Sequence, residues 1–160
     1  MKLSLTNAMV KHIVEAVKNN KLRYALGGVY NNILVITCDG AIMYRAEVNN
    51  DFIEYLNKVK QPAADYQAMT HLFESLEKYI VRSYAYDEFD EVTHRGKKFK
   101  QVTYNDNKYL FDPRYLTQFR SKKYELNLFI YGAHHGVIVH EYDTKDDIYD
   151  ECAVIMGVLA

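Results

Sequence analysis

The most constraining stretch of this chain covers residues 22–48, which have the pattern of three antiparallel strands. Residues 34–37 are apolar and rich in β-branched side chains, as is typical of a buried strand. Asn31-Asn32 precedes this run and Asp39-Gly40 follows it, and both dipeptides favour turns. The stretch therefore predicts a strand, a tight turn, a second strand, a corner and a returning strand over residues 41–48.

Composition sets broad limits on the class of protein. With 160 residues the chain is most simply one domain, and it is long enough to bury a core. Its formal net charge of −1 neither requires nor excludes nucleic acid, because a basic face can be hidden in a neutral total. Cys38 and Cys152 lie far apart in apolar runs, so we expect buried free thiols in a reducing compartment.

Nothing in the sequence suggests a membrane partner. No apolar run approaches the roughly 20 residues of a membrane-spanning helix. Lys2, Asn7 and Lys11 interrupt the first residues, which therefore lack the apolar core of a signal peptide. We expect a cytoplasmic protein with no membrane partner.

Two amphipathic helices with basic outer sides are predicted, one in each half of the chain. The first follows Thr6 or Asn7, and apolar residues recur at helical spacing from Met9 to Val17. The second begins at Asp112-Pro113, a capping residue followed by proline at the first helical position. Its buried side is formed by Tyr115, Leu116 and Phe119.

Residues 49–97 between these helices are expected to form a helical insertion. Asp51 and Glu54 suggest a capping box for a helix that ends before Pro62. A second helix is predicted over residues 63–81 from its apolar spacing. Residues 84–91 are aromatic and acidic and favour an edge strand or a loop, and residues 95–98 favour a basic turn.

The last part of the chain repeats the order of the first. Strands are predicted over residues 99–104 and 108–111, joined by a turn at 105–107, and the second helix follows. A hairpin over residues 126–142, an acidic connection over 143–151 and a closing strand over 152–159 complete the set. We therefore predict one α+β domain with a duplicated β-α-β-β-β unit, whose parts are residues 1–48, 49–97 and 98–160.

Four segments of the chain resemble, in order, those of one known family. Met1-Lys2-Leu3-Ser4-Leu5 opens the chain, Leu110-Phe111-Asp112-Pro113-Arg114-Tyr115-Leu116 leads into the second helix, and residues 153–159 form an apolar ending. In the three-strand stretch over residues 22–48, the matching residues are Arg23, Tyr24, Leu26, Gly28, Val29, Val35, Asp39 and Gly40. Together they are similar to a domain of the bacterial DNA sliding clamp, the beta subunit of DNA polymerase III.

The resemblance implies a single DNA-clamp-like domain that contacts DNA through its duplicated helices. In that family these helices line a ring, and basic side chains hold double-stranded DNA through its phosphates without reading sequence. The candidate DNA-binding residues of this chain are Lys11, Lys18, Arg114, Arg120, Lys122 and Lys123.

Sliding clamps also bind short peptides of DNA polymerases and other replication proteins in an apolar pocket. Aliphatic and methionine side chains suit such an adaptable groove. The positions that match the pocket are Leu26, Cys38, Gly40, Met43, Val154, Ile155 and Met156. The alternative is that each of these is an ordinary core residue of a strand.

The chain departs from the family pattern at several points. Ala41-Ile42 stands where the family has His-Arg, and Gly157 stands where it has proline. Residues 49–80 have no counterpart. A clamp subunit carries three such domains and this chain has room for one, so a closed ring would need about six copies in a symmetric homo-oligomer.

Two hypotheses follow for the function. The first is a DNA sliding-clamp-like processivity or scaffold factor that self-associates around DNA and binds replication partners. The second is a protein-interaction module of a phage or mobile element, an inhibitor or adaptor that keeps the clamp fold without encircling DNA. Residues 84–91 and the added helices would then form its working surface.

Other motifs point to no catalytic chemistry. His134-His135, His140 and Glu141 match no zinc spacing, and histidines in a hairpin are expected at the surface. The acidic residues after Asp143 do not follow EF-hand spacing. Nucleophile-elbow, phosphate-loop and H-E-x-x-H motifs do not occur. We therefore expect a protein that is not an enzyme and has neither a metal nor another cofactor.

Overall fold

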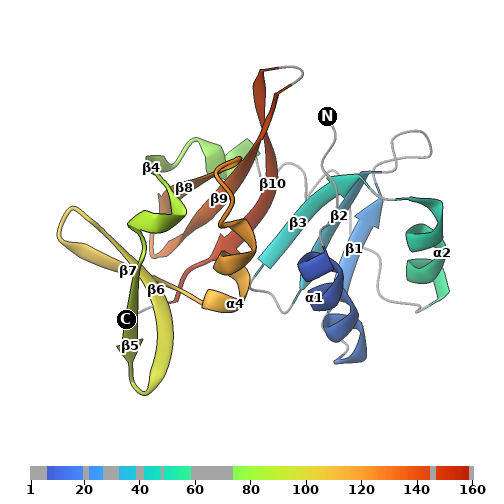
Figure 1. Cartoon of the computed structure of the whole chain (residues 1–160), viewed down its shortest axis with the longest axis horizontal. Helices are drawn as coiled ribbons and strands as arrows, with labels where there is room; N and C mark the ends of the chain where they lie inside the picture. Colours follow the sequence, from blue (N-terminus) through green and yellow to red (C-terminus); the bar gives the residue numbers. More distant parts are fainter. Residues whose placement is uncertain are drawn as a thin grey trace.

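The protein is a mixed α+β protein in which strands predominate (Figure 1). The computed structural model describes residues 7–19, 22–26, 33–38, 42–47, 49–58, 74–144 and 147–158. Within these ranges, only the backbone is described for residues 17, 22–26, 33–38, 46, 47, 53, 56, 57, 143, 148 and 149. No helix in these described ranges is long and apolar enough to cross a membrane.

The centre of the fold is an antiparallel sheet of seven strands in the order β1-β2-β3-β10-β9-β8-β4 (Figure 1). These strands are β1 (Leu22–Leu26), β2 (Ile33–Cys38), β3 (Ile42–Glu47), β4 (Ile80–Tyr84), β8 (Tyr124–Tyr131), β9 (His134–Asp143) and β10 (Ile148–Met156). Two meanders, β1-β2-β3 and β8-β9-β10, meet in the middle of the sheet. The pairs Tyr44–Ala153, Met43–Val154 and Ile42–Ile155 form this joint.

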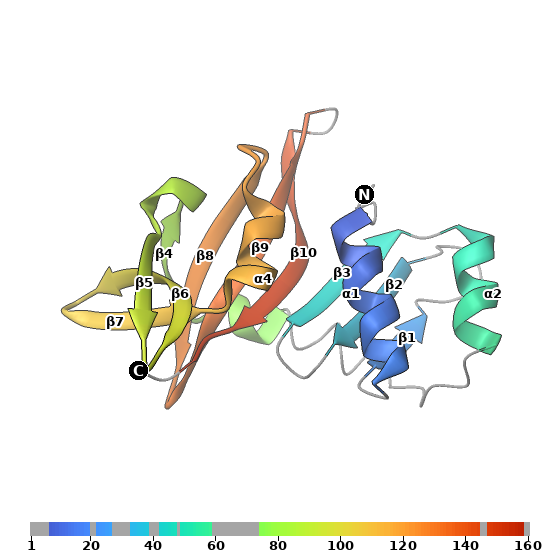
Figure 2. The same ribbon diagram turned by 60° about the horizontal axis from the view of Figure 1, so that its bottom comes forward.

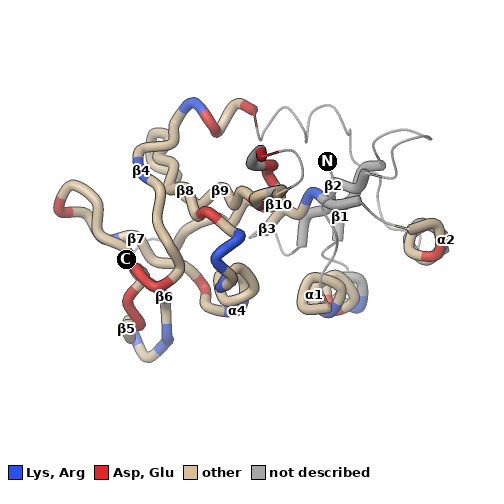
Figure 3. The backbone as a smooth tube through the Cα atoms, turned by 45° about the horizontal axis from the view of Figure 1, so that its top comes forward, with Lys and Arg blue, Asp and Glu red and all other residues tan. Residues whose placement is uncertain are grey.

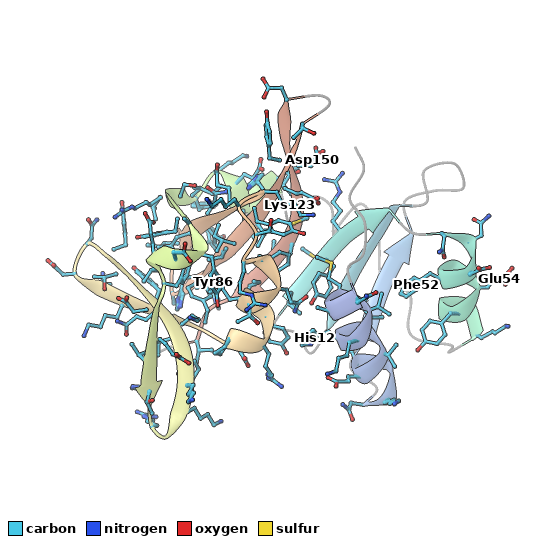
Figure 4. All side chains as sticks on the ribbon, viewed as in Figure 1. His12, Phe52, Glu54, Tyr86, Lys123 and Asp150 are labelled. Atoms are coloured by element: carbon cyan, nitrogen blue, oxygen red, sulfur yellow. The ribbon has the colours of Figure 1, made fainter. Side chains whose placement is uncertain are left out.

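Each meander is preceded by a helix, so that a helix and three strands occur twice. α1 (Asn7–Lys18) leads to β1, and α4 (Pro113–Leu116), extended by the 3-10 turn η2 (Thr117–Phe119), leads to β8. Both helices lie on the same face of the large sheet (Figure 2). They touch there, because the rings of His12 and Tyr115 are 5.4 Å apart, and Figure 4 shows His12 on the side of α1 that faces α4.

A second sheet consists of β5 (Asp90–His94), β6 (Lys97–Tyr104) and β7 (Asn107–Phe111). Its two hairpins have two-residue turns in which both residues have positive φ: 49° and 79° at Arg95-Gly96, and 48° and 65° at Asn105-Asp106. Such turns match the right-handed twist of the strands they join. The turn predicted at residues 105–107 is present at Asn105-Asp106, with Asn107 already in β7. The basic turn predicted at residues 95–98 is limited to Arg95-Gly96, because Lys97 and Lys98 belong to β6.

The main core lies between the helix-bearing face of the large sheet, the two helices and the small sheet. Its largest buried members come from all of these elements: Ile13, Tyr44, Phe111, Leu116 and Phe119 are each 0% exposed. A smaller apolar cluster lies on the opposite face of the large sheet and contains Met43, Leu76, Phe129, Ile138 and Val154. Leu76 comes from a helical turn at residues 74–77.

Several sequence-based elements are confirmed. The helix over residues 7–18, the three strands of the first meander and the helix at Asp112-Pro113 are present. The Asp112 carboxylate accepts a hydrogen bond of 2.9 Å from the Arg114 backbone N–H, as expected for a helix cap. Tyr115, Leu116 and Phe119 form the buried side of this segment.

The prediction of a helical insertion over residues 49–97 is only partly correct. α2 (Asn50–Lys58) is present, but the Phe52 N–H donates to Asn49 Oδ1, so Asn49 and not Asp51 provides the cap. The helix predicted up to residue 81 is wrong at its end, because residues 80–84 form β4 and pair with β8. Pairing with an apolar neighbouring strand outweighs the helical spacing of Leu76 and Ile80.

The prediction of an acidic connection over residues 143–151 is also wrong in its bounds. β9 extends to Asp143 and β10 begins at Ile148, so most of the predicted connection is strand. Asp150 is buried. The predicted strand before residue 6, the turns at 31–32 and 39–40, and residues 63–73 of the predicted helix lie outside the described residues.

Candidate functional site

The outer side of α1 presents two of the predicted DNA-binding residues. Met9, Ile13 and Ala16 recur at helical spacing and are buried against the sheet. Lys11, Glu15 and Lys18 have the same spacing on the opposite side and are exposed. Lys11 and Lys18 therefore point away from the core of the protein.

The segment around α4 presents the other four. Arg114 is 69% exposed and is paired with the capping Asp112, with Nη2 at 2.8 Å from Oδ2. Burial alone would raise the pKa of Asp112, but the hydrogen bonds and the charge of Arg114 lower it below its usual value. Arg120 and Lys122 follow η2 and are exposed.

Lys123, like Arg114, is engaged in an ion pair. Its Nζ lies 3.2 Å from Glu141 and 5.0 Å from the centre of the Tyr124 ring. Burial would lower the pKa of Lys123, but Tyr124 and the Glu141 carboxylate raise it above its usual value. Lys123 lies above α4 in Figure 4, and its ion pair makes its charge less available than those of Arg120 and Lys122.

The two basic segments are neighbours, because the rings of His12 on α1 and Tyr115 on α4 pack against each other. We call residues 7–19 and 112–124 the helix surface. It carries six basic and two acidic residues, a net charge of +4 in a chain whose total is −1 (Figure 3). With the residues that the structure describes, Lys11, Lys18, Arg120 and Lys122 form no ion pair. Exposed cations on a helix and on the turn that follows η2 are suited to contacts with phosphate groups.

The predicted peptide-binding residues do not form one open groove where they are described. Met43 and Val154 are opposite each other at the joint between β3 and β10, and both are buried in the smaller apolar cluster. Ile155 is buried on the other face, in the main core. Met156 is half-buried against the smaller cluster, Leu26 and Cys38 are described by backbone only, and Gly40 lies outside the described residues.

The expected surface position of the histidines is correct only for His134. His135 is 7% exposed, and its ring packs 4.8 Å from the Tyr109 ring, between β9 and the small sheet. A Cβ atom at residue 157 would overlap this ring, which gives a structural reason for the glycine at this position. Burial lowers the pKa of His135.

His140 belongs to a row of polar residues that crosses four neighbouring strands. We call Arg45 on β3, Asn127 on β8, His140 on β9 and Glu151 on β10, together with Glu77 from the turn at 74–77, the polar row. His140 Nδ1 lies 2.7 Å from Asn127 Nδ2, and His140 Nε2 lies 2.9 Å from Glu77 Oε1. Arg45 Nη1 lies 3.3 Å from Glu151 Oε2.

The two carboxyl groups of the polar row influence each other. Burial raises the pKa of Glu151, and the nearby Glu77 carboxylate raises it further. Burial would also raise the pKa of Glu77, but its hydrogen bonds to Glu151 and His140 lower it. Glu151 is the less exposed of the two, with 18% of its side chain accessible against 38% for Glu77, so it is the carboxyl group that more readily holds a proton.

Sequence reasoning did not find the polar row, because its members are far apart in the chain. His140 and Glu77 are 63 positions apart, and Arg45 and Glu151 are 106 positions apart. The available signal is that Asn127 and His140 interrupt apolar strands at positions that face away from the helices. No spacing rule connects such isolated interruptions before the sheet order is known.

Residues 84–91 differ from the predicted interaction surface in one respect. Tyr84 and Phe89 are 5% and 4% exposed and belong to the main core. The acidic residues Asp87, Glu88, Asp90 and Glu91 are exposed on the 3-10 turn η1 (Tyr86–Glu88) and on β5. The acidic part of this segment is therefore accessible, and two of its aromatic residues are not.

Comparisons with protein-family models, with curated proteins and with solved structures find no match for this chain.

Proposed function

We propose that this protein is a DNA sliding-clamp-like processivity or scaffold factor that self-associates around DNA and binds replication partners. The observation that carries the proposal is the helix surface. Two helices, each preceding a three-strand meander, lie on one face of the sheet, and with the turn after the second helix their segments, residues 7–19 and 112–124, carry a net charge of +4. The repeat of a helix followed by three strands supports the proposal, while the strand expected before the first helix lies outside the described residues.

The chemistry of the helix surface suits DNA binding that does not depend on base sequence. Lys11 and Lys18 are separated by two helical turns, and Arg120 and Lys122 extend the charge beyond α4. Long flexible cations of this kind neutralise phosphates and release counterions, which gives affinity without fixing the protein at one site. The apolar anchors Ile13 and Leu116, both 0% exposed, hold the helices so that the charges keep their arrangement.

The DNA-binding part of the proposal is tested by reversing charge on the helix surface. The variant Lys11→Glu, Lys18→Glu, Arg114→Glu and Arg120→Glu is compared with the unmodified protein by fluorescence anisotropy on a DNA duplex over a range of salt concentrations. We expect the variant to lose at least about a hundredfold in affinity at low salt, because its reversed charges repel the phosphates. The salt dependence should also weaken, since each lost phosphate contact lowers the slope of log K against log salt by about 0.9.

The matched control reverses four exposed lysines elsewhere, by Lys78→Glu, Lys97→Glu, Lys98→Glu and Lys108→Glu. It changes the net charge by the same amount, so it separates local binding from the total charge of the protein. We expect the control to retain most of the affinity. Equal losses in both variants, or unchanged binding in the first, would contradict the proposal.

Self-association is tested by light scattering over a concentration series, with and without the duplex. A closed assembly of about six copies would agree with a ring made from single domains. A monomer that ignores DNA at high concentration would instead favour the second candidate, a protein-interaction module. The exposed acidic residues from Asp87 to Glu91 favour that candidate, since they offer a surface for a basic partner.

A further inference from the structure

The polar row contains three potential metal ligands that come from three separate elements. One ligand atom each from Glu77, His140 and Glu151 lies within 4.8 Å of the other two. Metal–ligand distances of about 2.0 to 2.2 Å place the ligands of one ion roughly 3 to 4 Å apart, so small side-chain rotations would close the site. We propose that Glu77, His140 and Glu151 bind a divalent transition-metal ion such as Zn²⁺ or Mn²⁺.

The donor set determines the class of ion. An imidazole nitrogen suits Zn²⁺ and its neighbours in the first transition series, while carboxylate oxygens also suit Mn²⁺. Mg²⁺ and Ca²⁺ prefer sites made of oxygen ligands. The combination of one imidazole and two carboxylates therefore favours Zn²⁺ or Mn²⁺ over the alkaline-earth ions.

Neighbouring residues hold the ligands in the way that metal sites require. The Asn127 amide contacts His140 Nδ1, which directs Nε2 toward the two carboxyl groups. For metal binding the amide turns by 180°, so that its oxygen accepts the Nδ1 proton and Nε2 presents its lone pair. Arg45 holds one oxygen of Glu151 from the other side, which leaves the second oxygen for the ion.

Electrostatics gives a further reason for a cation at this position. Glu77 and Glu151 face each other, and two carboxylates in contact repel unless a proton or a cation lies between them. Arg45 compensates the charge of Glu151, whereas the group beside Glu77 is His140, whose imidazole is neutral when its Nε2 binds a metal ion. A divalent ion between the carboxylates would compensate the other and join the helical turn at 74–77 to β9 and β10.

Metal binding to the folded state alone stabilises the fold by mass action, since the unfolded chain does not bring the three residues together. We would titrate the metal-stripped full-length protein with ZnCl₂ and with MnCl₂ by calorimetry, and follow its thermal unfolding in parallel. We expect one ion per chain and a rise in the midpoint temperature of unfolding. Glu77→Gln and Glu151→Gln should each weaken binding by at least tenfold.

Two control variants make the outcome specific. Glu74→Gln removes the same charge from the same helical turn, and His134→Gln removes the exposed histidine of the nearby hairpin. Both should bind as the unmodified protein does. Glu77 is partly exposed, so Glu77→Gln is expected to fold, which circular dichroism would verify.

The proposal is overturned if neither ion binds the unmodified protein at millimolar concentration. It is also overturned if Glu77→Gln and Glu151→Gln leave the affinity unchanged, or if Glu74→Gln weakens it equally. Because these variants lie on the face opposite α1 and α4, DNA binding through the helix surface is an independent question.

Discussion

The two faces of the large sheet are covered and stabilised in different ways. On the helix-bearing face, α1, α4 and the small sheet bury large apolar side chains such as Ile13, Phe111 and Leu116 completely. On the opposite face, the described cover is the helical turn at 74–77, and the apolar cluster below it is followed by the polar row. One face relies on hydrophobic area, while the other combines a small apolar cluster with charged pairs.

This difference shows how a sheet can carry ionisable groups without losing its core. In the polar row, Glu77 keeps contact with water, with 38% of its side chain accessible, while the less accessible Arg45 and Glu151 are paired with each other. The same residues on the helix-bearing face would lose all their hydration. Partial exposure and pairing with opposite charge are therefore what allow this face to hold charged side chains.

The largest expected effect is on the helix-bearing face. Leu116→Ala should lower the free energy of unfolding by about 2 to 5 kcal/mol, because it leaves a cavity beneath α4 in a fully buried position. Leu76→Ala on the opposite face is the matched change, and it should cost less because the 8% exposed site can be filled by water. Urea denaturation measures both, and a larger loss for Leu76→Ala would contradict the contrast.

A smaller effect is expected in the polar row. Arg45→Met should lower the free energy of unfolding by about 1 to 3 kcal/mol, since Glu151 then faces Glu77 without a compensating charge. The value lies below that for a fully buried pair because 14% and 18% of the two side chains are exposed. The double variant Arg45→Met, Glu151→Leu should recover part of the loss. An equal or greater loss in the double variant would show that the pairing is not the cause.

Removing the cap of α4 should have an effect of about 1 kcal/mol. Asp112→Ala leaves the Arg114 N–H without its hydrogen bond, and thermal or urea unfolding would measure the loss. Asp112→Asn keeps an acceptor and should lose less. If both variants lose the same amount, the ion pair with Arg114 and not the cap carries the effect.

The smallest expected effect is a change with pH. The pKa of His135 is lowered by burial, so the unfolded chain takes up a proton first as the pH falls below about 6.5. The folded state then loses stability progressively until the pH passes the lower pKa of the folded state. Urea unfolding at pH 7.5 and pH 5.5 would show this decline, and His135→Gln should reduce it. The same slope in both proteins would assign the decline to other groups.

Local patterns predicted most of the helix-bearing face. The apolar spacing of α1, the proline after Asp112 and the apolar run of β2 each specify an element from neighbouring residues, and all three elements are present. The burial of Tyr115, Leu116 and Phe119 followed from the same patterns. In this part of the chain, local preference and the final fold agree.

The opposite face could not be predicted in the same way. β4 has a helical spacing with the residues before it, and only its pairing with β8 makes it a strand. The polar row requires the order β3-β10-β9-β8, which brings together residues from distant parts of the chain. The charge of the helix surface was visible in the sequence, whereas the contact between His12 and Tyr115 that unites it was not.

The joint between β3 and β10 has a consequence for how the chain folds. The segment from α4 to β10 is continuous in sequence, so its hairpins can close with short loops and little entropic cost. The three residue pairs of the joint instead connect positions about 110 apart, as in Tyr44 and Ala153. The second unit is thus expected to form early in folding, and the first unit to dock onto it in a later and slower step.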